Sequence, residues 1–216
     1  MIGDIERLLT ELTDAGVRYI VVGGVAVVLH GYGRSTADLD IVIDFEPANL
    51  EHALAFFDER GFKPRPPVPL RAFGDAAERQ RWIDEKNLQV FSLWHPAMPY
   101  FAVGIFVKEP FPFEEAYRRA TRAPLGQSLV TVASIDDIID MKRAAGRPQD
   151  AIDIEVLLAL KKSPPTDQLR DAPFDGSFEA TRRRQALLGR DVPVAERLHW
   201  FERHMAELRR LQGRAS

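Results

Sequence analysis

Two aspartates, Asp38 and Asp40, stand two residues apart in a stretch where apolar and acidic residues nearly alternate. In a β-strand this spacing places both carboxylates on one face, with Asp44 further along it. Carboxylates held side by side repel each other, and a hard divalent cation such as Mg²⁺, which is commonly shared with substrate phosphates, relieves that repulsion. The pair therefore indicates a site for a metal–nucleotide complex, with the solvated face of an ordinary half-buried strand as the alternative.

A glycine pair, Gly23-Gly24, ends an apolar run and opens a short helical pattern upstream of these acids. Glycines let a phosphate approach the backbone closely, and free N–H groups at the start of a helix favour an anion. A plain strand-to-helix turn would use the same residues. Two other phosphate motifs do not fit, because Gly31-x-Gly33 lacks a third glycine and no Gly-Lys-Ser/Thr occurs in the sequence.

Taken together, these residues resemble a known signature. Val22-Gly23-Gly24, thirteen intervening residues and Asp38-Leu39-Asp40 are similar to the hG[GS]…[DE]h[DE] motif of the nucleotidyltransferase superfamily with the DNA-polymerase-beta-like fold. Residues 142–154, KRAAGRPQDAIDI, are similar to the K…R..D..D helix pair of the abortive-infection, toxin-like branch and of related uncharacterised bacterial proteins. The two motifs together cover residues 1–160.

The resemblance implies a fold and an activity. The fold is α/β (α+β), a minimal nucleotidyltransferase mixed sheet flanked by helices, with a C-terminal helical extension. The activity is transfer of a nucleoside monophosphate from an NTP to a hydroxyl of RNA, protein or a small molecule, with Mg²⁺ held by Asp38 and Asp40.

The resemblance also implies roles for other residues. Gly23 and Gly24 would bind the phosphates, and Arg34 would neutralise them in a bidentate way. Lys142 would contact a phosphate or the transition state, and Asp153 would orient it. In the same segment, Arg147 and Asp150 would act likewise or pair with each other, and a salt-bridged helix turn is the alternative for the whole segment.

One position departs from the family pattern. These enzymes usually supply a third carboxylate from a following strand, which completes the metal site and serves as a base. In the segment FAVGIFV, residues 101–107, Gly104 occupies the place expected for that acid. Asp44 and Gln89 are the candidates to lie nearby, but glutamine cannot take a proton at neutral pH. The sequence therefore predicts either impaired catalysis or a different alignment of this strand.

Hydrophobic periodicity and turn residues predict the remaining elements. Helices are expected at 2–12, 25–30, 47–60, 75–85, 114–120, 134–145, 150–162, 178–188 and 194–211. Strands are expected at 17–22, 39–44, 88–94, 101–107 and 125–132. A proline-rich extended loop is expected at 64–69, as a rim or lid.

Composition excludes several classes of protein. The 216 residues are 45% hydrophobic and 28% charged, which is typical of a soluble globular chain. There is no cysteine, so disulfides, thiolate metal sites and cysteine nucleophiles are excluded. No apolar run is long enough for a transmembrane helix and the first ten residues lack a signal-peptide pattern, so we expect a cytoplasmic protein with no membrane partner.

Charge and proline content divide the chain into an expected nucleotidyltransferase-like domain at 1–163, a linker at 164–176 and an arginine-rich helical tail at 177–216. The tail holds nine arginines, no lysine and five acids, whereas the rest of the chain carries a net charge of −7. Such a tail could contact RNA, dock on its own domain, or fold over the acidic cleft as an internal inhibitor.

Three functions remain open from sequence. The first is a Mg²⁺-dependent nucleotidyltransferase that acts on RNA or protein, for which a place in a toxin–antitoxin pair is one option. The second is a nucleotide-binding module that lost turnover with the acid at Gly104. The third is an antitoxin-like regulator whose tail recognises a cognate partner.

Overall fold

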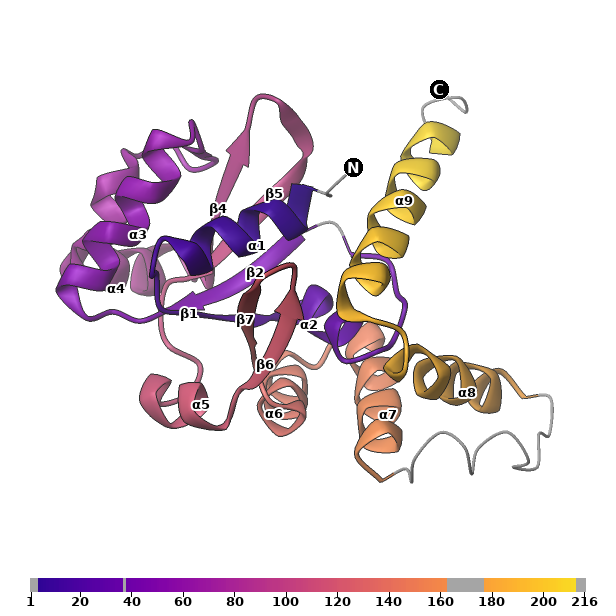
Figure 1. The fold of residues 1–216 in the computed structure, drawn as a ribbon. Helices are drawn as coiled ribbons and strands as arrows, with labels where there is room; N and C mark the ends of the chain where they lie inside the picture. The colour runs from indigo at the N-terminus through magenta and orange to yellow at the C-terminus, as the bar shows by residue number, and fades with distance from the viewer. Residues whose placement is uncertain (1–3, 37, 163–176, 213–216) are drawn as a thin grey trace.

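The computed structural model describes residues 4–36, 38–162 and 177–212. In these residues one seven-stranded sheet, with the strand order β3-β4-β5-β2-β1-β7-β6, is flanked by helices (Figure 1). The strands are β1 Tyr19–Val22, β2 Asp38–Ile43, β3 Lys63–Pro64, β4 Val90–His95, β5 Met98–Phe106, β6 Thr121–Leu125 and β7 Ser128–Val132. The helices are α1 Asp4–Asp14, α2 Gly23–Leu29, α3 Pro47–Glu59, the 3₁₀ helix η1 Leu70–Gly74, α4 Ala76–Lys86, α5 Phe113–Arg119, α6 Ile135–Ala145, α7 Pro148–Lys162, α8 Phe178–Arg190 and α9 Val194–Gln212.

The sheet is mixed, as predicted. The central strand β2 runs antiparallel to β1 and parallel to β5, while β1 pairs in parallel with β7. Three antiparallel pairs, β3 with β4, β4 with β5 and β6 with β7, complete the outer parts of the sheet. The predicted fold class, a mixed sheet flanked by helices with a C-terminal helical extension, is confirmed.

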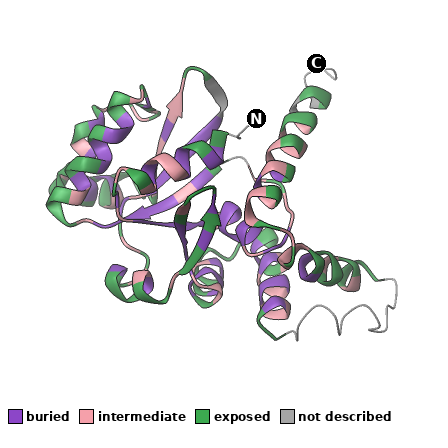
Figure 2. Ribbon diagram, in the orientation of Figure 1, coloured by how far each residue is buried: buried purple, intermediate pink, exposed green. Residues whose placement is uncertain are grey.

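The centre of the sheet is the core of the molecule (Figure 2). On β2 the side chains of Leu39, Ile41 and Ile43 are fully buried, whereas Asp38 is exposed and Asp40 is half-buried. Successive strand residues point to opposite faces, so the apolar residues anchor the strand while the acids reach the other face. The predicted alternation of β2 is therefore confirmed.

Local signals explain where several helices begin and end. Ser134 caps α6, because its Oγ accepts a hydrogen bond from the Asp137 N–H at 3.2 Å and donates one to Asp137 Oδ2 at 2.6 Å. Gly146, in the left-handed conformation, ends that helix. Asp75 caps α4, and Asn87 in the left-handed conformation ends it. Ser134 and Gly146 thus set the two ends of α6, the helix that carries Lys142.

The glycine pair opens a helix as predicted, because Gly23 and Gly24 are the first two residues of α2. One expectation about the elements was wrong. The segment predicted as one strand at 125–132 holds the end of β6, a turn with Gly126 at φ +58° and β7, which pair as a hairpin. The sequence missed β6 because its alternation is interrupted by Pro124, which a strand accepts only at an edge.

The tail helices α8 and α9 pack on the rest of the chain, on the opposite side of the molecule from α3 and α4 (Figure 1). Their neighbours include α7, α2, β6 and α1. The expected linker at 164–176 lies outside the described residues, so the domain boundary stays a prediction. Among the described helices, none combines the length and the apolar character that crossing a membrane requires.

Candidate functional site

The glycine turn and the acidic strand meet at one point. β1 delivers Gly23 to the start of α2 with φ +67°, a conformation that residues with a side chain rarely adopt. A Cβ atom at Gly23 would collide with the Oδ2 atom of Asp40 on the neighbouring strand. Gly24 is equally close to a side chain, because a Cβ there would lie 2.5 Å from Thr36 Oγ1. Gly23 therefore lets the backbone lie directly against the Asp40 carboxylate, and Gly24 lets it lie against Thr36.

Asp38 and Asp40 point to the same face of β2, as predicted. β5 runs parallel beside them, with Ala102 in register with Asp38 and Gly104 in register with Asp40. In the described residues neither carboxylate has an ion-pair partner within 4.0 Å. The two acids thus form an open pair at the beginning of the strand.

The electrostatic environment of Asp40 is unusual. Burial, together with the negative charge of Asp38, raises the pKa of Asp40 to about 6. The positive charges of Arg147, Lys142 and Arg34 act in the opposite direction and lower this pKa. The charges of these three basic side chains therefore act on Asp40, although none of them forms an ion pair with it among the described residues.

The second motif forms a buried ionic cluster where α6 meets α7. Lys142 Nζ lies 3.0 Å from Asp150 Oδ1 and 2.6 Å from Asp153 Oδ2, and the side chain of Asp153 is 0% exposed. Arg34, from the loop before β2, also forms an ion pair with Asp153 Oδ2. We call Arg34, Lys142, Asp150 and Asp153 the basic–acidic cluster. It joins the loop after α2 to the α6–α7 pair.

Arg147 and Asp150 are in contact, but through the backbone. The Arg147 N–H donates to Asp150 Oδ2 at 3.1 Å. The Arg147 side chain is exposed, and its charge acts on Asp40. The sequence left two roles open for these residues, contact with a phosphate or pairing with each other. The structure shows a contact between the two residues, within the turn between α6 and α7.

The strand register places Gly104, the residue expected at the third-acid position, beside Asp40. A Cβ atom there would be 2.5 Å from Asp40 Oδ1 and 2.7 Å from Val90 Cγ1. Neither proposed substitute for the acid faces the site: Asp44 is buried and paired with Arg18 at 2.6 Å, and Gln89 is exposed and bonds to Asn87.

Some neighbours of the site were missed by sequence reasoning. Ser92 on β4 pairs with Gly104 and so stands on the same face as Asp40. Gln149 donates to Asp153 Oδ1 at 3.3 Å. Thr36 packs on Gly24. Of these three residues, only Thr36 could have been found from the sequence. It lies two residues before Asp38 and therefore near the face that carries the two acids.

The donor set fits a hard divalent cation with two protein carboxylates. The carboxylates of Asp38 and Asp40 have no ion-pair partner among the described residues, and a cation would relieve their mutual repulsion. In the part of the chain that the structure describes, no group of three or more acids, histidines or cysteines is arranged to hold a metal. A metal here would thus depend on other ligands, such as phosphate oxygens, to complete its coordination.

The tail does not lie over the acidic pair. Asp38 is exposed, and the tail packs on α1, α2, α7, β6 and the loop after α2. The Ile5 N–H donates to Glu202 Oε1 at 2.7 Å, and Arg197 donates to the carbonyl of Val192 at 2.7 Å and to that of Leu29. The structure thus shows a tail docked on its own domain and does not support an inhibitory cover.

No protein-family model and no curated protein matches this chain. Several solved structures are similar to it. One of them is the lincosamide antibiotic adenylyltransferase LnuA with lincomycin bound, which is 15% identical with a TM-score of 0.48 over 74% of this chain and 98% of its own. Another is an antigenic nucleotidyltransferase-like protein from Paracoccidioides brasiliensis, 17% identical with a TM-score of 0.43 over 90% of each chain. The likeness at these TM-scores is a loose one.

Proposed function

We propose that this protein binds a Mg²⁺–NTP complex and transfers the nucleoside monophosphate to an acceptor hydroxyl on RNA, protein or a small molecule. The observation that carries the proposal is the contact between Gly23 and Asp40. It puts a backbone turn suited to phosphates directly against a carboxylate suited to a metal. A magnesium–phosphate complex needs both at one point.

Each residue has a role in this proposal. Asp38 and Asp40 hold Mg²⁺, which when bound neutralises phosphate charge and orients the triphosphate. Gly23 and Gly24 leave room for the phosphates. Arg34 and Lys142 lend positive charge, and their shared partner Asp153 positions them.

The transfer step follows from the chemistry of NTPs. The acceptor oxygen bonds to the α-phosphorus, the bond from that phosphorus to the bridging oxygen breaks, and pyrophosphate leaves. With Gly104 beside Asp40, no carboxylate of β5 takes the acceptor's proton, which passes to water. Positioning and charge neutralisation provide most of the catalysis in phosphoryl transfer, so the reaction does not depend on a third acid.

A second function is favoured by Gly104 itself. A nucleotide-binding or antitoxin-like regulatory protein would keep the acidic pair and lose the base. The similarity of residues 142–154 to the toxin-like branch is the reason to place either form in a toxin–antitoxin pair, with a cognate partner, in the cytoplasm.

An assay with α-labelled NTPs, Mg²⁺, total RNA and total protein separates these functions. We expect label on a macromolecule with the natural chain, and its loss in Asp38→Asn and Asp40→Asn. Asp84→Asn, an exposed acid on α4 that bonds Gln80, is the matched control and should keep full labelling. Mg²⁺-dependent NTP binding without label supports the nucleotide-binding module, and absence of both binding and label contradicts both the transferase and the nucleotide-binding module.

Restoring the third acid needs space as well as charge. In Gly104→Asp the new Cβ would meet Asp40 and Val90, so the single variant displaces the very carboxylate it should assist. The double variant Gly104→Asp with Val90→Ala removes one of the two collisions. We expect it to label more than the single variant, and Gly104→Ala with Val90→Ala, which has the space but no acid, is its control.

A further inference from the structure

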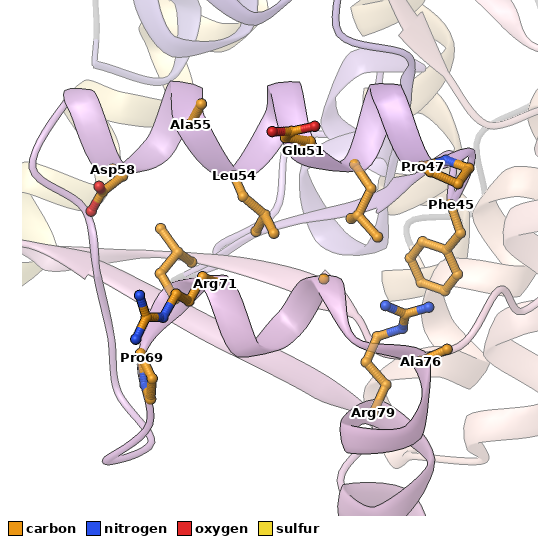
Figure 3. Close-up of a pocket in the computed structure, with 13 residues that line it drawn as sticks. Phe45, Pro47, Glu51, Leu54, Ala55, Asp58, Pro69, Arg71, Ala76 and Arg79 are labelled. Atoms are coloured by element: carbon orange, nitrogen blue, oxygen red, sulfur yellow. The ribbon is translucent and has the colours of Figure 1, made fainter.

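A groove lies on the far side of the molecule from the tail, between α3 on one wall and η1 with the start of α4 on the other (Figure 3). Its volume is about 730 Å³. Leu54 projects into it from α3, and Leu50 and Leu70 also line it. The walls are therefore apolar, and the volume is typical of a small-molecule site, roughly 300–1,000 Å³.

One charged side chain of the groove is buried. Arg79 is only 8% exposed, and Figure 3 shows its guanidinium directed toward Phe45 at one end of the groove. Its Cζ atom lies 4.3 Å from the centre of the Phe45 ring and 5.6 Å from that of Phe73. Burying a cation is unfavourable unless an anion compensates it.

That anion is not supplied by the described residues. Arg79 Nη1 donates to the Phe73 carbonyl at 2.7 Å, which is a neutral acceptor. Asp75 and Glu109 are the nearest acids that act on its charge, and neither comes within the 4.0 Å of an ion pair. Asp75 is moreover committed to capping α4, since its Oδ1 accepts from the Ala77 N–H at 2.8 Å.

The free donors of Arg79 have the geometry that a carboxylate needs. Among the described residues the Nε–H and Nη2–H groups have no acceptor, although these atoms are not sealed from solvent. These two groups form one edge of the guanidinium, which binds both oxygens of a carboxylate in parallel. The other charges of the groove, Glu51, Asp58 and Arg71, lie on exposed positions where water screens them.

We propose that this groove binds a small organic carboxylic acid with an apolar aryl or alkyl body, whose carboxylate pairs with Arg79. The apolar body lies along Leu54 and Leu70. Phe45 lies five residues beyond Asp40, about 16 Å along an extended chain, so the groove is separate from the nucleotide site. The proposal is thus independent of the proposed transfer activity.

Binding can be tested on the full chain, labelled with ¹⁵N, by NMR titration without nucleotide or metal. The probes are 4-phenylbutyrate and octanoate, each compared with its neutral alcohol, 4-phenylbutan-1-ol and octan-1-ol. We expect the acids to shift the amides of Phe45, Leu54, Leu70 and Ala76 and to bind at least tenfold more tightly than the alcohols. Equal affinity of acids and alcohols, or no shift with either acid up to about 5 mM, overturns the proposal.

Variants locate the source of the preference. Arg79→Met keeps the apolar stem and should bind acids no better than alcohols, while Arg79→Lys keeps the charge but loses the fork and should retain only part of the preference. Arg71→Met, which removes the exposed arginine at the other end of the groove, is the matched control and should keep it. If Arg79→Met still binds the acids as much more tightly than the alcohols as the natural chain does, the proposal is contradicted. If that variant does not fold, the affinities of the natural chain for acids and alcohols decide the test.

Discussion

Lys142 and Arg79 are both buried basic side chains, and their surroundings are opposite. Lys142 contacts two carboxylates, Asp150 and Asp153, within 3.0 Å. Arg79 contacts a carbonyl and two aromatic rings, and no acid lies within ion-pair distance of it in the described part of the chain. One charge is compensated by the chain itself and the other is not.

The difference separates two uses of a buried charge. Compensated charges such as Lys142 join segments distant in sequence and hold a site in shape. An uncompensated charge at the wall of a groove is positioned for an anion from outside. Electrostatic partners, more than burial, thus distinguish architecture from recognition.

Removing the shared carboxylate of the basic–acidic cluster should have the largest effect. Asp153→Asn leaves Lys142 and Arg34 without their common buried partner, and we expect a loss of roughly 3–5 kcal/mol in the free energy of unfolding, measured with urea. Asp136→Asn removes an exposed partner of Lys161 and should cost less than about 0.5 kcal/mol. A loss below about 1 kcal/mol for Asp153→Asn would show that Asp150 alone compensates Lys142.

Asp40 offers an unpaired anion for the same comparison, and its removal should stabilise the metal-free protein. Its pKa is about 6 in the folded chain against an ordinary value of 3.8. Between these pH values the folded state keeps a proton that the unfolded state has released, so stability falls as pH rises from 4 to 6 and stays low above. Asp40→Asn removes this loss, and we expect it to gain roughly 2 kcal/mol at pH 8 and nothing at pH 4, by urea unfolding in a chelator.

The matched control for that measurement is Asp84→Asn, which should show no gain at either pH. Mg²⁺ should stabilise the natural chain at pH 8 and leave Asp40→Asn unchanged. A gain for Asp40→Asn that is equal at pH 4 and pH 8 would mean that the carboxylate charge is not its cause.

Replacing Arg79 should have the smallest effect on stability. Arg79→Met loses one hydrogen bond and the contact with two rings, but it also removes a buried charge, so we expect a loss of about 1 kcal/mol by urea unfolding. Arg71→Met, at an exposed position, should change stability by less than that. A loss of 3 kcal/mol or more for Arg79→Met would mean that the chain itself compensates this charge and would remove the contrast with Lys142.

Much of the site could be predicted because its residues lie close together in sequence. The alternation around Asp38 and Asp40 fixes their common face, and the glycine pair marks the start of α2. The strand register places Gly104 beside Asp40.

Other features depend on contacts between distant segments, which periodicity does not encode. The pair of Arg34 with Asp153 joins residues 119 positions apart. Arg79 falls within the helix expected at 75–85, but its burial results from the packing of η1 and Phe45 around it, which the sequence pattern does not encode. The tail's docking on α1 and α2 could not be chosen from its charge alone, since Arg197 uses its guanidinium on carbonyl groups.

The parallel pairing of β1 with β7 bears on the order of events during synthesis. Val21 at the centre of the sheet pairs with Val132, so β1 lacks one of its two neighbours until most of the sheet has left the ribosome. Asp153 is made later still, and without it Arg34 and Lys142 have no common anchor. A nascent chain that ends before Asp153 therefore holds the glycine turn and both acids in its sequence but lacks the residue that joins Arg34 to Lys142.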